Sequence, residues 1–226
     1  MNVILFDINE TVLSLAVLRP KFAEALGDAS LTDRWFALLL HSSTVSAMTG
    51  VTTNFKELSQ IALEGLAARL GISLSAERRD DILGTFASLP AHDDIKPALA
   101  RLREAGFRTV AFSNSSQALI TSQIHNAGLD DCFDRVISVE GAGTFKPDIR
   151  AYQFAAKELG IAVDSLRLVA CHDWDTHGAI SAGLSAAYIN RLGAPYNPLY
   201  NRPEIEAATM GAIVDQILAA QEPGLA

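Results

Sequence analysis

Five short apolar runs rich in β-forming residues, separated by stretches of helical periodicity, are the feature that most constrains this fold. Strands that alternate with helices are typical of βαβ units and of a parallel sheet. Nearly continuous apolar character is expected where helices cover both faces of such a sheet. The pattern predicts an α/β fold with a doubly wound, Rossmann-like parallel sheet. The expected strands are Val3–Phe6, Thr109–Phe112, Arg135–Val139, Leu166–Ala170 and Ala186–Ile189.

The segment from about Leu13 to Pro90 breaks this alternation, because it contains helical periods and no convincing strand. A helical insert directly after the first strand indicates a cap on an α/β core. We therefore expect a core domain of residues 1–13 and 91–226 and a helical cap domain of residues 14–90. The expected cap helices are Arg19–Leu26, Leu31–His41, Phe55–Leu70 and Ala76–Ala87, and the last core helix is expected at Ala207–Ala220.

Composition and charge narrow the class of partner. The chain has 49% apolar and 19% charged residues and a net charge of −8, with no basic run that could neutralise a nucleic-acid backbone. The N-terminus lacks a basic region before its apolar run, and the uncharged stretch 35–55 is rich in Ser and Thr. The two cysteines, Cys132 and Cys171, have no metal-ligand spacing, which favours free thiols. We expect a soluble, cytoplasmic protein with no nucleic-acid or membrane partner.

Polar residues follow four of the predicted strands at the point where each strand ends. Asp7 follows the first, Ser113 and Asn114 the second, Lys146 the loop after the third, and the segment 171–175 the fourth. In open parallel sheets, ligands bind beyond the carboxyl ends of the strands. The sequence therefore predicts a functional site at this edge, with Asp7 as a nucleophile or a metal ligand.

Four segments at these strand ends, FDINETVL, VAFSNSS, FKPDIRAYQ and VACHDWDTHGA, resemble the four motifs of the haloacid-dehalogenase superfamily. In detail they are similar to its type II branch, the L-2-haloacid dehalogenases. The resemblance covers the whole chain, including the cap. It implies a hydrolase, without a cofactor, that displaces halide from a short 2-haloacid through an aspartyl ester on Asp7.

The resemblance also implies a role for each matching residue. Asp7 matches the nucleophile, Thr11 the residue that holds it, and Lys146 the cation that keeps it ionised. Asp175 matches the carboxylate near that lysine. The remaining matches concern substrate: Ser113 and Asn114 for the substrate carboxylate and halide, Tyr152 behind the lysine, and Trp174 near the halide. Simpler interpretations stay open, namely a helix cap for Ser113 and a core residue for Tyr152.

Three departures from the family pattern bear on the reaction. Phosphatases of the superfamily carry a second Asp two residues after the nucleophile, where this chain has Asn9, which we also count among the substrate-binding residues. A halide needs no proton to leave, so Asn9 favours dehalogenation. Type II enzymes grip the halide with a cap arginine, where this chain has Phe36. Arg34 lies about 200° round a helix from Phe36 and cannot simply substitute for it. Either the alignment slips, another donor such as His41 helps, or the substrate differs.

The third departure places His172 and Asp173 where a serine-type residue and an asparagine usually orient water. His172 is either a general base for ester hydrolysis or a structural histidine.

Two other functions stay open. One is a phosphatase that holds Mg²⁺ with Asp7, a backbone carbonyl and Asp175. The other is an orphan hydrolase or a binding protein, which the missing cap arginine favours. Each takes a small anionic molecule, and a homodimer stays open as the assembly. Without the arginine, we expect weak or absent activity on chloro- and bromopropionate, and a gain on Phe36→Arg.

Overall fold

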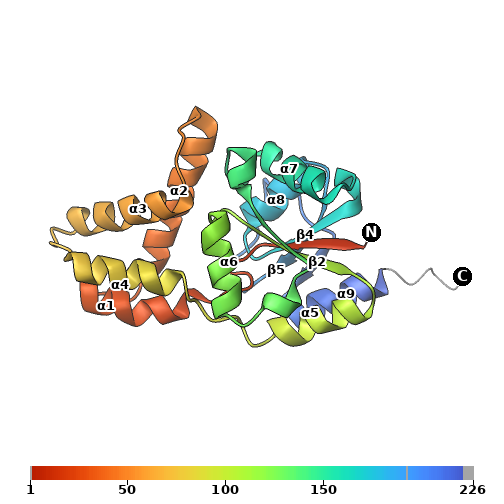
Figure 1. Ribbon diagram of the computed structural model, residues 1–226, viewed down its shortest axis with the longest axis horizontal. Coiled ribbons are helices and arrows are strands. Elements are labelled where there is room, and N and C mark those ends of the chain that lie inside the picture. The colour runs from red at the N-terminus through yellow and green to blue at the C-terminus, as the bar shows by residue number, and fades with distance from the viewer. Residues whose placement is uncertain (1, 192, 221–226) are drawn as a thin grey trace, which may run out of the picture.

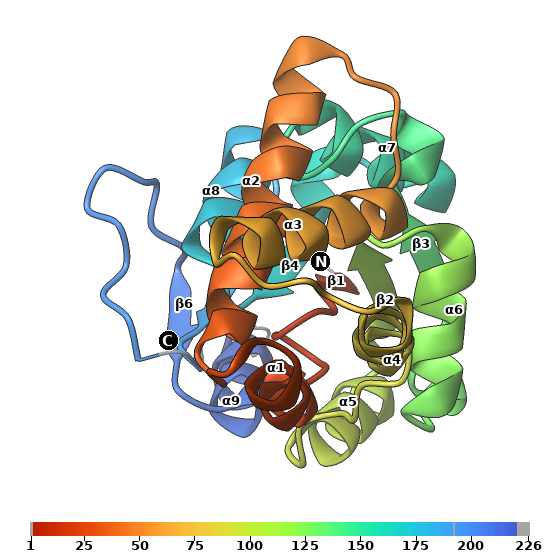
Figure 2. The ribbon, with the colours of Figure 1, turned by 90° about the vertical axis from the view of Figure 1, so that its left-hand side faces the viewer.

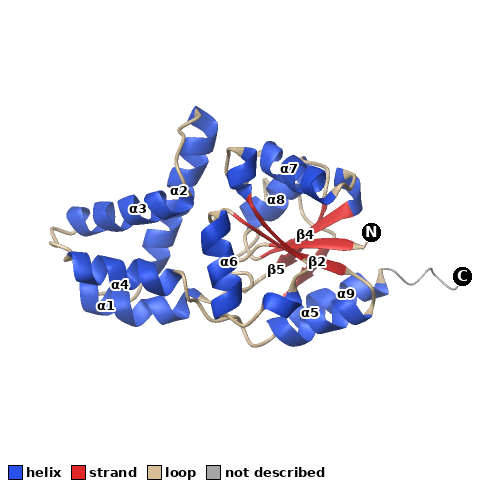
Figure 3. Cartoon of the chain, viewed as in Figure 1, coloured by secondary structure: helices blue, strands red, loops and turns tan. Residues whose placement is uncertain are grey.

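A six-stranded, fully parallel sheet forms the centre of this protein in a computed structural model that describes residues 2–191 and 193–220. The strand order is β3-β2-β1-β4-β5-β6, and every neighbouring pair runs parallel. Figure 3 shows the strands together in the core, with helices around them. The predicted doubly wound α/β fold is therefore confirmed. The strands are β1 (Val3–Phe6), β2 (Arg108–Ser113), β3 (Arg135–Ser138), β4 (Leu166–Ala170), β5 (Ser185–Ile189) and β6 (Ile205–Ala207).

The sequence predicted five of these strands to within two residues at each end and missed β6. That strand has only three residues and pairs along one edge with β5, so it is too short to show a hydrophobic period. β6 also includes Ala207, which was expected to be the first residue of the last helix.

Helices cover both faces of the sheet, as the apolar strands require. In Figure 1, α7 and α8 lie on one side of the sheet, and α5 and α9 lie on the other. The strand order reverses between β1 and β4, which defines the switch point where ligands bind in such sheets. The core helices are α5 (Ile95–Glu104), α6 (Gln117–Asn126), α7 (Ile149–Leu159), α8 (Asp173–Ser181) and α9 (Met210–Ala219), with short 3₁₀ turns at Asp130–Cys132, Val139–Ala142 and Val163–Ser165.

The insert after β1 is a separate group of four helices at the carboxyl ends of the strands (Figures 1 and 2). A helix of this group is longer than predicted: α2 continues past His41 to Thr49. Its Ser and Thr residues caused the early predicted end, but Ser43 and Thr44 both donate to the carbonyl of Leu40, at 2.8 and 3.0 Å. Hydroxyls satisfied in this way are tolerated inside a helix. The insert comprises the 3₁₀ turn Leu15–Leu18, α1 (Arg19–Leu26), α2 (Leu31–Thr49), α3 (Phe55–Arg69) and α4 (Ala76–Phe86).

The chain leaves the core and returns to it at one place. The amide of Ser14 donates to the carbonyl of Pro90 at 2.8 Å, and the amide of His92 donates to that of Val12 at 3.0 Å. Two adjacent crossings are what an inserted cap requires, and they support a domain boundary at residues 13–14 and 90–91, which stays a proposal. Of the expected core, residues 1, 192 and 221–226 lie outside the described residues.

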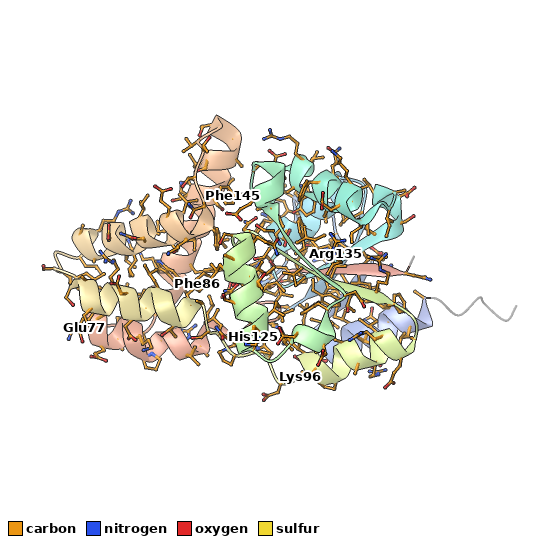
Figure 4. The ribbon with its side chains drawn as sticks, in the orientation of Figure 1. Glu77, Phe86, Lys96, His125, Arg135 and Phe145 are labelled. Atoms are coloured by element: carbon orange, nitrogen blue, oxygen red, sulfur yellow. The ribbon has the colours of Figure 1, made fainter. Side chains whose placement is uncertain are left out.

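Aromatic side chains fill the boundary between the helical insert and the core. Within the insert, Phe86 packs edge-on against Trp35 with ring centroids 5.4 Å apart, and across the boundary Phe55 contacts Phe145 of the core at 6.3 Å. Figure 4 shows Phe86 and Phe145 at this boundary. The insert therefore turns aromatic side chains towards the core. No helix within the described part of the chain is long and apolar enough to cross a membrane.

Candidate active site

Asp7 lies at the carboxyl end of β1, directly beside the switch point of the sheet. Its amide continues the ladder by donating to the carbonyl of Val169 on β4 at 3.0 Å, and only 4% of the residue is exposed. Thr11, one turn further on, donates its hydroxyl to Asp7 Oδ2 at 2.7 Å and accepts from the amide of Cys171 at 2.9 Å. The sequence predicted this contact, which fixes the carboxylate between β1 and β4.

Lys146 places its ammonium group between two buried carboxylates. Its Nζ lies 2.8 Å from Asp7 Oδ1 and 2.6 Å from Asp175 Oδ2, and the side chain is 1% exposed. The ammonium also lies 5.1 Å from the centre of the Phe112 ring. Sequence reasoning placed all three charged groups at this edge, and the structure brings them into direct contact.

Tyr152 and Gly178 support the position of Asp175. The Tyr152 hydroxyl donates to Asp175 Oδ1 at 2.6 Å, so the tyrosine reaches the lysine through the carboxylate. A Cβ atom on Gly178 would lie 2.6 Å from that hydroxyl and 2.7 Å from Cβ of Pro147, closer than real contacts allow. Glycine at this position therefore lets α7 and α8 approach closely enough for the hydrogen bond to form.

The two carboxylates on Lys146 differ in acidity. Burial favours the neutral form of Asp7, but the Lys146 ammonium and the contact with His172 outweigh it and hold its pKa far below the usual range. Burial raises the pKa of Asp175, despite the attraction of Lys146. Burial also opposes the charge of Lys146, but Asp175 and Asp7 raise its pKa above the usual value. Asp7 is therefore held as a carboxylate beside a permanent cation, as a nucleophile requires.

Ser113 and Asn114 lie at the end of β2, where the sequence placed them. Asn114 Oδ1 accepts from the amide of Lys146 at 2.9 Å, while its buried Nδ2 has no partner among the described residues. Ser113 Oγ accepts from the amide of Ser115 at 3.1 Å. The cap of α6 is Ser116 and not Ser113, since the Ser116 hydroxyl accepts from Leu119. Ser113 therefore keeps its hydroxyl hydrogen, and Asn114 an amide donor, for a ligand.

His172 contacts the other carboxylate oxygen of Asp7 than the lysine does. Its Nδ1 lies 3.4 Å from Asp7 Oδ2, and its Nε2 lies 2.8 Å from Oε2 of Glu10. Burial opposes a charge on this ring, but the sulfur of Cys171 and the carboxylates of Asp7 and Glu10 raise the pKa of His172 well above its usual value. The surroundings of His172 therefore favour its imidazolium form.

Glu10 is a site residue that sequence reasoning missed. It is the only non-glycine in the described chain with a positive φ angle, 66°, a conformation that L-residues rarely adopt. The sequence could have suggested it, because an acidic residue stands in the first motif and an unexpected histidine stands in the fourth. Only the folded turn shows that these two side chains meet.

The contacts of Asn9 and Arg34 give no direct support to their expected roles in substrate binding, which stay predictions. Both ends of the Asn9 amide have partners within the protein, because Nδ2 donates to Ser115 at 3.2 Å and Oδ1 accepts from Gln123 at 3.0 Å. Asn9 therefore ties the loop after β1 to α6. Arg34 is exposed on α2, on a different side from buried Phe36, as the 200° separation implies.

The cap places an aromatic ring over the site where an arginine was expected. Phe36 is 3% exposed, and its ring centre lies 6.2 Å from that of His172. His41, the other donor considered, is exposed. Trp174 stacks on His172 with ring centres 5.1 Å apart and an interplanar angle of 26°. His172 thus contacts two aromatic rings, and Trp174 lies next to it within the site.

Asp173 binds backbone amides. Its carboxylate accepts from the amides of Trp174 at 2.7 Å and Asn197 at 3.2 Å, so it connects the start of α8 to the loop that follows β5. Cys171 and Cys132 are both free thiols, as predicted.

The residues at this edge do not fit the magnesium site of the phosphatase alternative. The ammonium of Lys146 lies between Asp7 and Asp175, in the space that a bridging cation would take. Within the described residues, no group of three or more His, Cys, Asp or Glu side chains could hold a metal ion.

Two hollows follow the boundary between cap and core, but neither is lined by Asp7, Lys146 or Asp175. The larger, of about 530 Å³, lies between α3, α4 and α6, and the smaller, of about 340 Å³, lies between the end of α2 and the start of α7. Asp7 is 4% exposed, so its carboxylate is enclosed in this structure.

Comparison with known proteins agrees with this geometry. Residues 1–168 match the family model of haloacid dehalogenase-like hydrolases. A (S)-2-haloacid dehalogenase of Pseudomonas fluorescens is 29% identical over 88% of this chain and 86% of its own. Another from Pseudomonas putida, (S)-2-haloacid dehalogenase H-109, is 28% identical over 95% and 93% of the two chains.

A solved structure shares the fold over its whole length. The L-2-haloacid dehalogenase of Xanthobacter autotrophicus, with chloropropionic acid covalently bound, superposes with a TM-score of 0.88 at 22% identity and covers 100% of both chains. The arrangement of core and helical insert is therefore the same in both proteins.

Proposed function

This chain belongs to the haloacid dehalogenase-like hydrolase family, and within that family we propose that it hydrolyses short 2-haloacids through an ester on Asp7. The observation that carries this proposal is the buried Asp7 carboxylate, held ionised between Lys146 and His172 at the switch point of the sheet. The names of the relatives support the same reaction class.

In the proposed reaction an oxygen of Asp7 attacks C2 of the haloacid, and the halide leaves with the bonding electrons. Lys146 and Thr11 hold the carboxylate in place for this attack. The enclosed site lacks bulk water, which strengthens electrostatic contacts with the nucleophile and with the departing anion. Water then hydrolyses the aspartyl ester and releases a 2-hydroxyacid.

The substrate would lie between the end of β2 and the aromatic rings of the cap. We propose that the Ser113 hydroxyl and the unpartnered Nδ2 of Asn114 bind the two negative groups, the carboxylate and the departing halide. Trp174 and Phe36 would line the apolar side. Asp175 and Tyr152 position Lys146 without touching substrate.

Activity assays on a small panel test this function. Purified protein is incubated with (S)-2-chloropropionate, (S)-2-bromopropionate and chloroacetate, with halide release as the readout, and with 4-nitrophenyl phosphate, with phosphate release as the readout. We expect halide release, bromide faster than chloride, and no phosphate release. Asp7→Asn should abolish halide release, and the exposed Asp131→Asn should leave it unchanged.

The opposite pattern would replace the proposal. Phosphate release that depends on Asp7 would favour the phosphatase, and binding of haloacid without halide release would favour the orphan or binding protein.

A further inference from the structure

The Glu10–His172 pair is the part of the site that the reaction above leaves unused. It joins two of the four motifs, because Glu10 follows β1 and His172 follows β4. The carboxylate–imidazole contact is 2.8 Å long, and the histidine side chain is 7% exposed and the glutamate side chain 16%. A buried ion pair directly beside the nucleophile, in a backbone turn with a positive φ angle, requires a physical reason.

The contacts of the ring define its protonation state. Each ring nitrogen of His172 faces a carboxylate oxygen, Nδ1 that of Asp7 and Nε2 that of Glu10. A neutral imidazole carries one hydrogen and one lone pair, so one nitrogen would then face a carboxylate with its lone pair. Only the doubly protonated ring satisfies both neighbours. The aromatic rings of Trp174 and Phe36 hold it in this orientation.

Esterification of Asp7 changes this balance. The ester is neutral, so His172 would then face one anion in place of two. The surroundings that keep the ring charged would be weakened at the moment when the reaction next requires a base. Glu10 would continue to accept from Nε2 and so leave Nδ1 directed at the ester.

We propose that the Glu10–His172 pair is a proton switch for the second half of the reaction, with the ring charged before Asp7 is alkylated and a general base afterwards. This inference rests on the proposed function. It assigns His172 the catalytic role and Glu10 the positioning role in ester hydrolysis.

The proton and electron balance closes. When Asp7 bonds to C2, the halide leaves with the bonding electrons, and the imidazolium releases one proton to solvent. Neutral His172 then takes a proton from water, whose oxygen bonds to Cγ of Asp7. The ester C–O bond breaks, and its electrons go to the hydroxyacid oxygen, which takes that proton from the ring. The remaining carboxyl proton of Asp7 passes to His172. One water is consumed and one hydrogen halide is released.

Pre-steady-state kinetics with (S)-2-chloropropionate test the switch. In His172→Asn we expect a burst of about one chloride per active site, followed by ester hydrolysis slowed by about 10²–10⁴, the usual contribution of a general base. Mass spectrometry should find the alkylated enzyme. Glu10→Gln should slow the same step less. His125→Asn, an exposed histidine on α6, should match the wild type. If His172→Asn slowed chloride release and hydrolysis equally, or neither, the switch would be refuted.

A second measurement needs no turnover, so it separates failure of this inference from failure of the proposed function. Asp7→Asn gives the nucleophile the neutral charge of the ester. The other titratable groups that face His172 are Glu10 and the Cys171 thiol, with Tyr188 of β5 nearby, while the cap contributes only uncharged Phe36. By NMR of the imidazole, His172 should titrate at a higher pH in the wild type than in Asp7→Asn. Equal titration in both proteins would overturn the switch, whatever the substrate proves to be.

Discussion

The two sides of Asp7 carry the same arrangement of charges but differ in chemistry. On one side, Lys146 lies between the carboxylates of Asp7 and Asp175, and on the other, His172 lies between those of Asp7 and Glu10. Both cations are buried and both have raised pKa values. The lysine starts from a value so high that it stays charged through the reaction. The histidine starts near neutrality, so the loss of one carboxylate is enough to release its proton.

A buried nucleophile can therefore have two cationic neighbours, one that stays charged and one that can lose its proton. The permanent one keeps Asp7 ionised and positioned. The reversible one can also move protons. The predictions below alter one side at a time.

Removal of the permanent charge should have the largest effect. Lys146→Met would leave Asp7 and Asp175 buried without a cation, so both carboxyls would tend to become protonated and Asp7 would lose its nucleophilicity. We expect halide release to fall by about 10³ or more, the size of effect seen for a lost electrostatic contact in an active site. Lys157→Met, an exposed lysine on α7, should have no effect.

Chelation of metal ions tests whether Lys146, and not a metal ion, supplies the positive charge beside Asp7. Because Lys146 supplies the cation, treatment with EDTA should leave halide release unchanged. Activity that is lost with EDTA and regained with Mg²⁺ would contradict the assignment and favour the phosphatase.

A smaller loss of halide release is expected when the side chains that position Lys146 are displaced. In Gly178→Ala the new Cβ would collide with the Tyr152 hydroxyl and Pro147, and would separate that hydroxyl from Asp175. Such overpacking typically costs about 1–3 kcal/mol of the free energy of unfolding. We expect a lower melting temperature and slower halide release. Gly211→Ala on α9, where a Cβ has no neighbour within 4 Å, should be neutral or slightly stabilising.

The lysine side was predictable from sequence and the histidine side was not. Parallel strands bring their carboxyl ends together, so Asp7, Lys146 and Asp175 could be assigned to one edge from the ends of the predicted strands, and the family resemblance implied their roles. The partner of His172 could not be assigned, because it depends on a turn in which Glu10 takes a positive φ angle. The spacing of apolar residues in a sequence gives no information about such turns.

The orientation of the cap could not be predicted from the sequence either. Helical period showed that α2 exists, but which of its side chains faces the nucleophile depends on how the insert packs on the core. The expected gain from Phe36→Arg assumed that Phe36 takes the place of the family's cap arginine. The structure places Phe36 among Trp35, Phe86 and the His172 ring, and a second cation there would face the imidazolium.

We therefore now predict that Phe36→Arg lowers activity several-fold and destabilises the protein. The loss should be smaller when His172 is also replaced by Asn, because the like-charge contact is then absent. A double-mutant cycle on halide release and melting temperature measures this coupling. Phe36→Leu should be mild in both backgrounds. A gain in Phe36→Arg alone would show that the cap has room for a halide-binding arginine.

The smallest predicted effect is on the pH dependence of stability. The pKa of His172 is higher in the folded protein than the value of about 6.5 expected in the unfolded chain. Its contribution to stability is therefore fully present below pH 6.5 and is lost as the pH rises through the folded value. Each tenfold difference in proton affinity is worth about 1.4 kcal/mol. Denaturant titrations between pH 6 and 10 should show this decline in the wild type and in His125→Asn, but not in His172→Asn.

The central claim, that Asp7 becomes covalently bound to substrate, is tested most directly by one turnover in H₂¹⁸O. Enzyme in excess over (S)-2-chloropropionate is allowed a single turnover, and the product and the peptide that contains Asp7 are analysed by mass spectrometry. The account predicts ¹⁸O in the carboxylate of Asp7 and none in the hydroxyacid, because water attacks Cγ of the ester. Label found in the hydroxyacid and absent from Asp7 would contradict it and would indicate direct attack of water on the substrate.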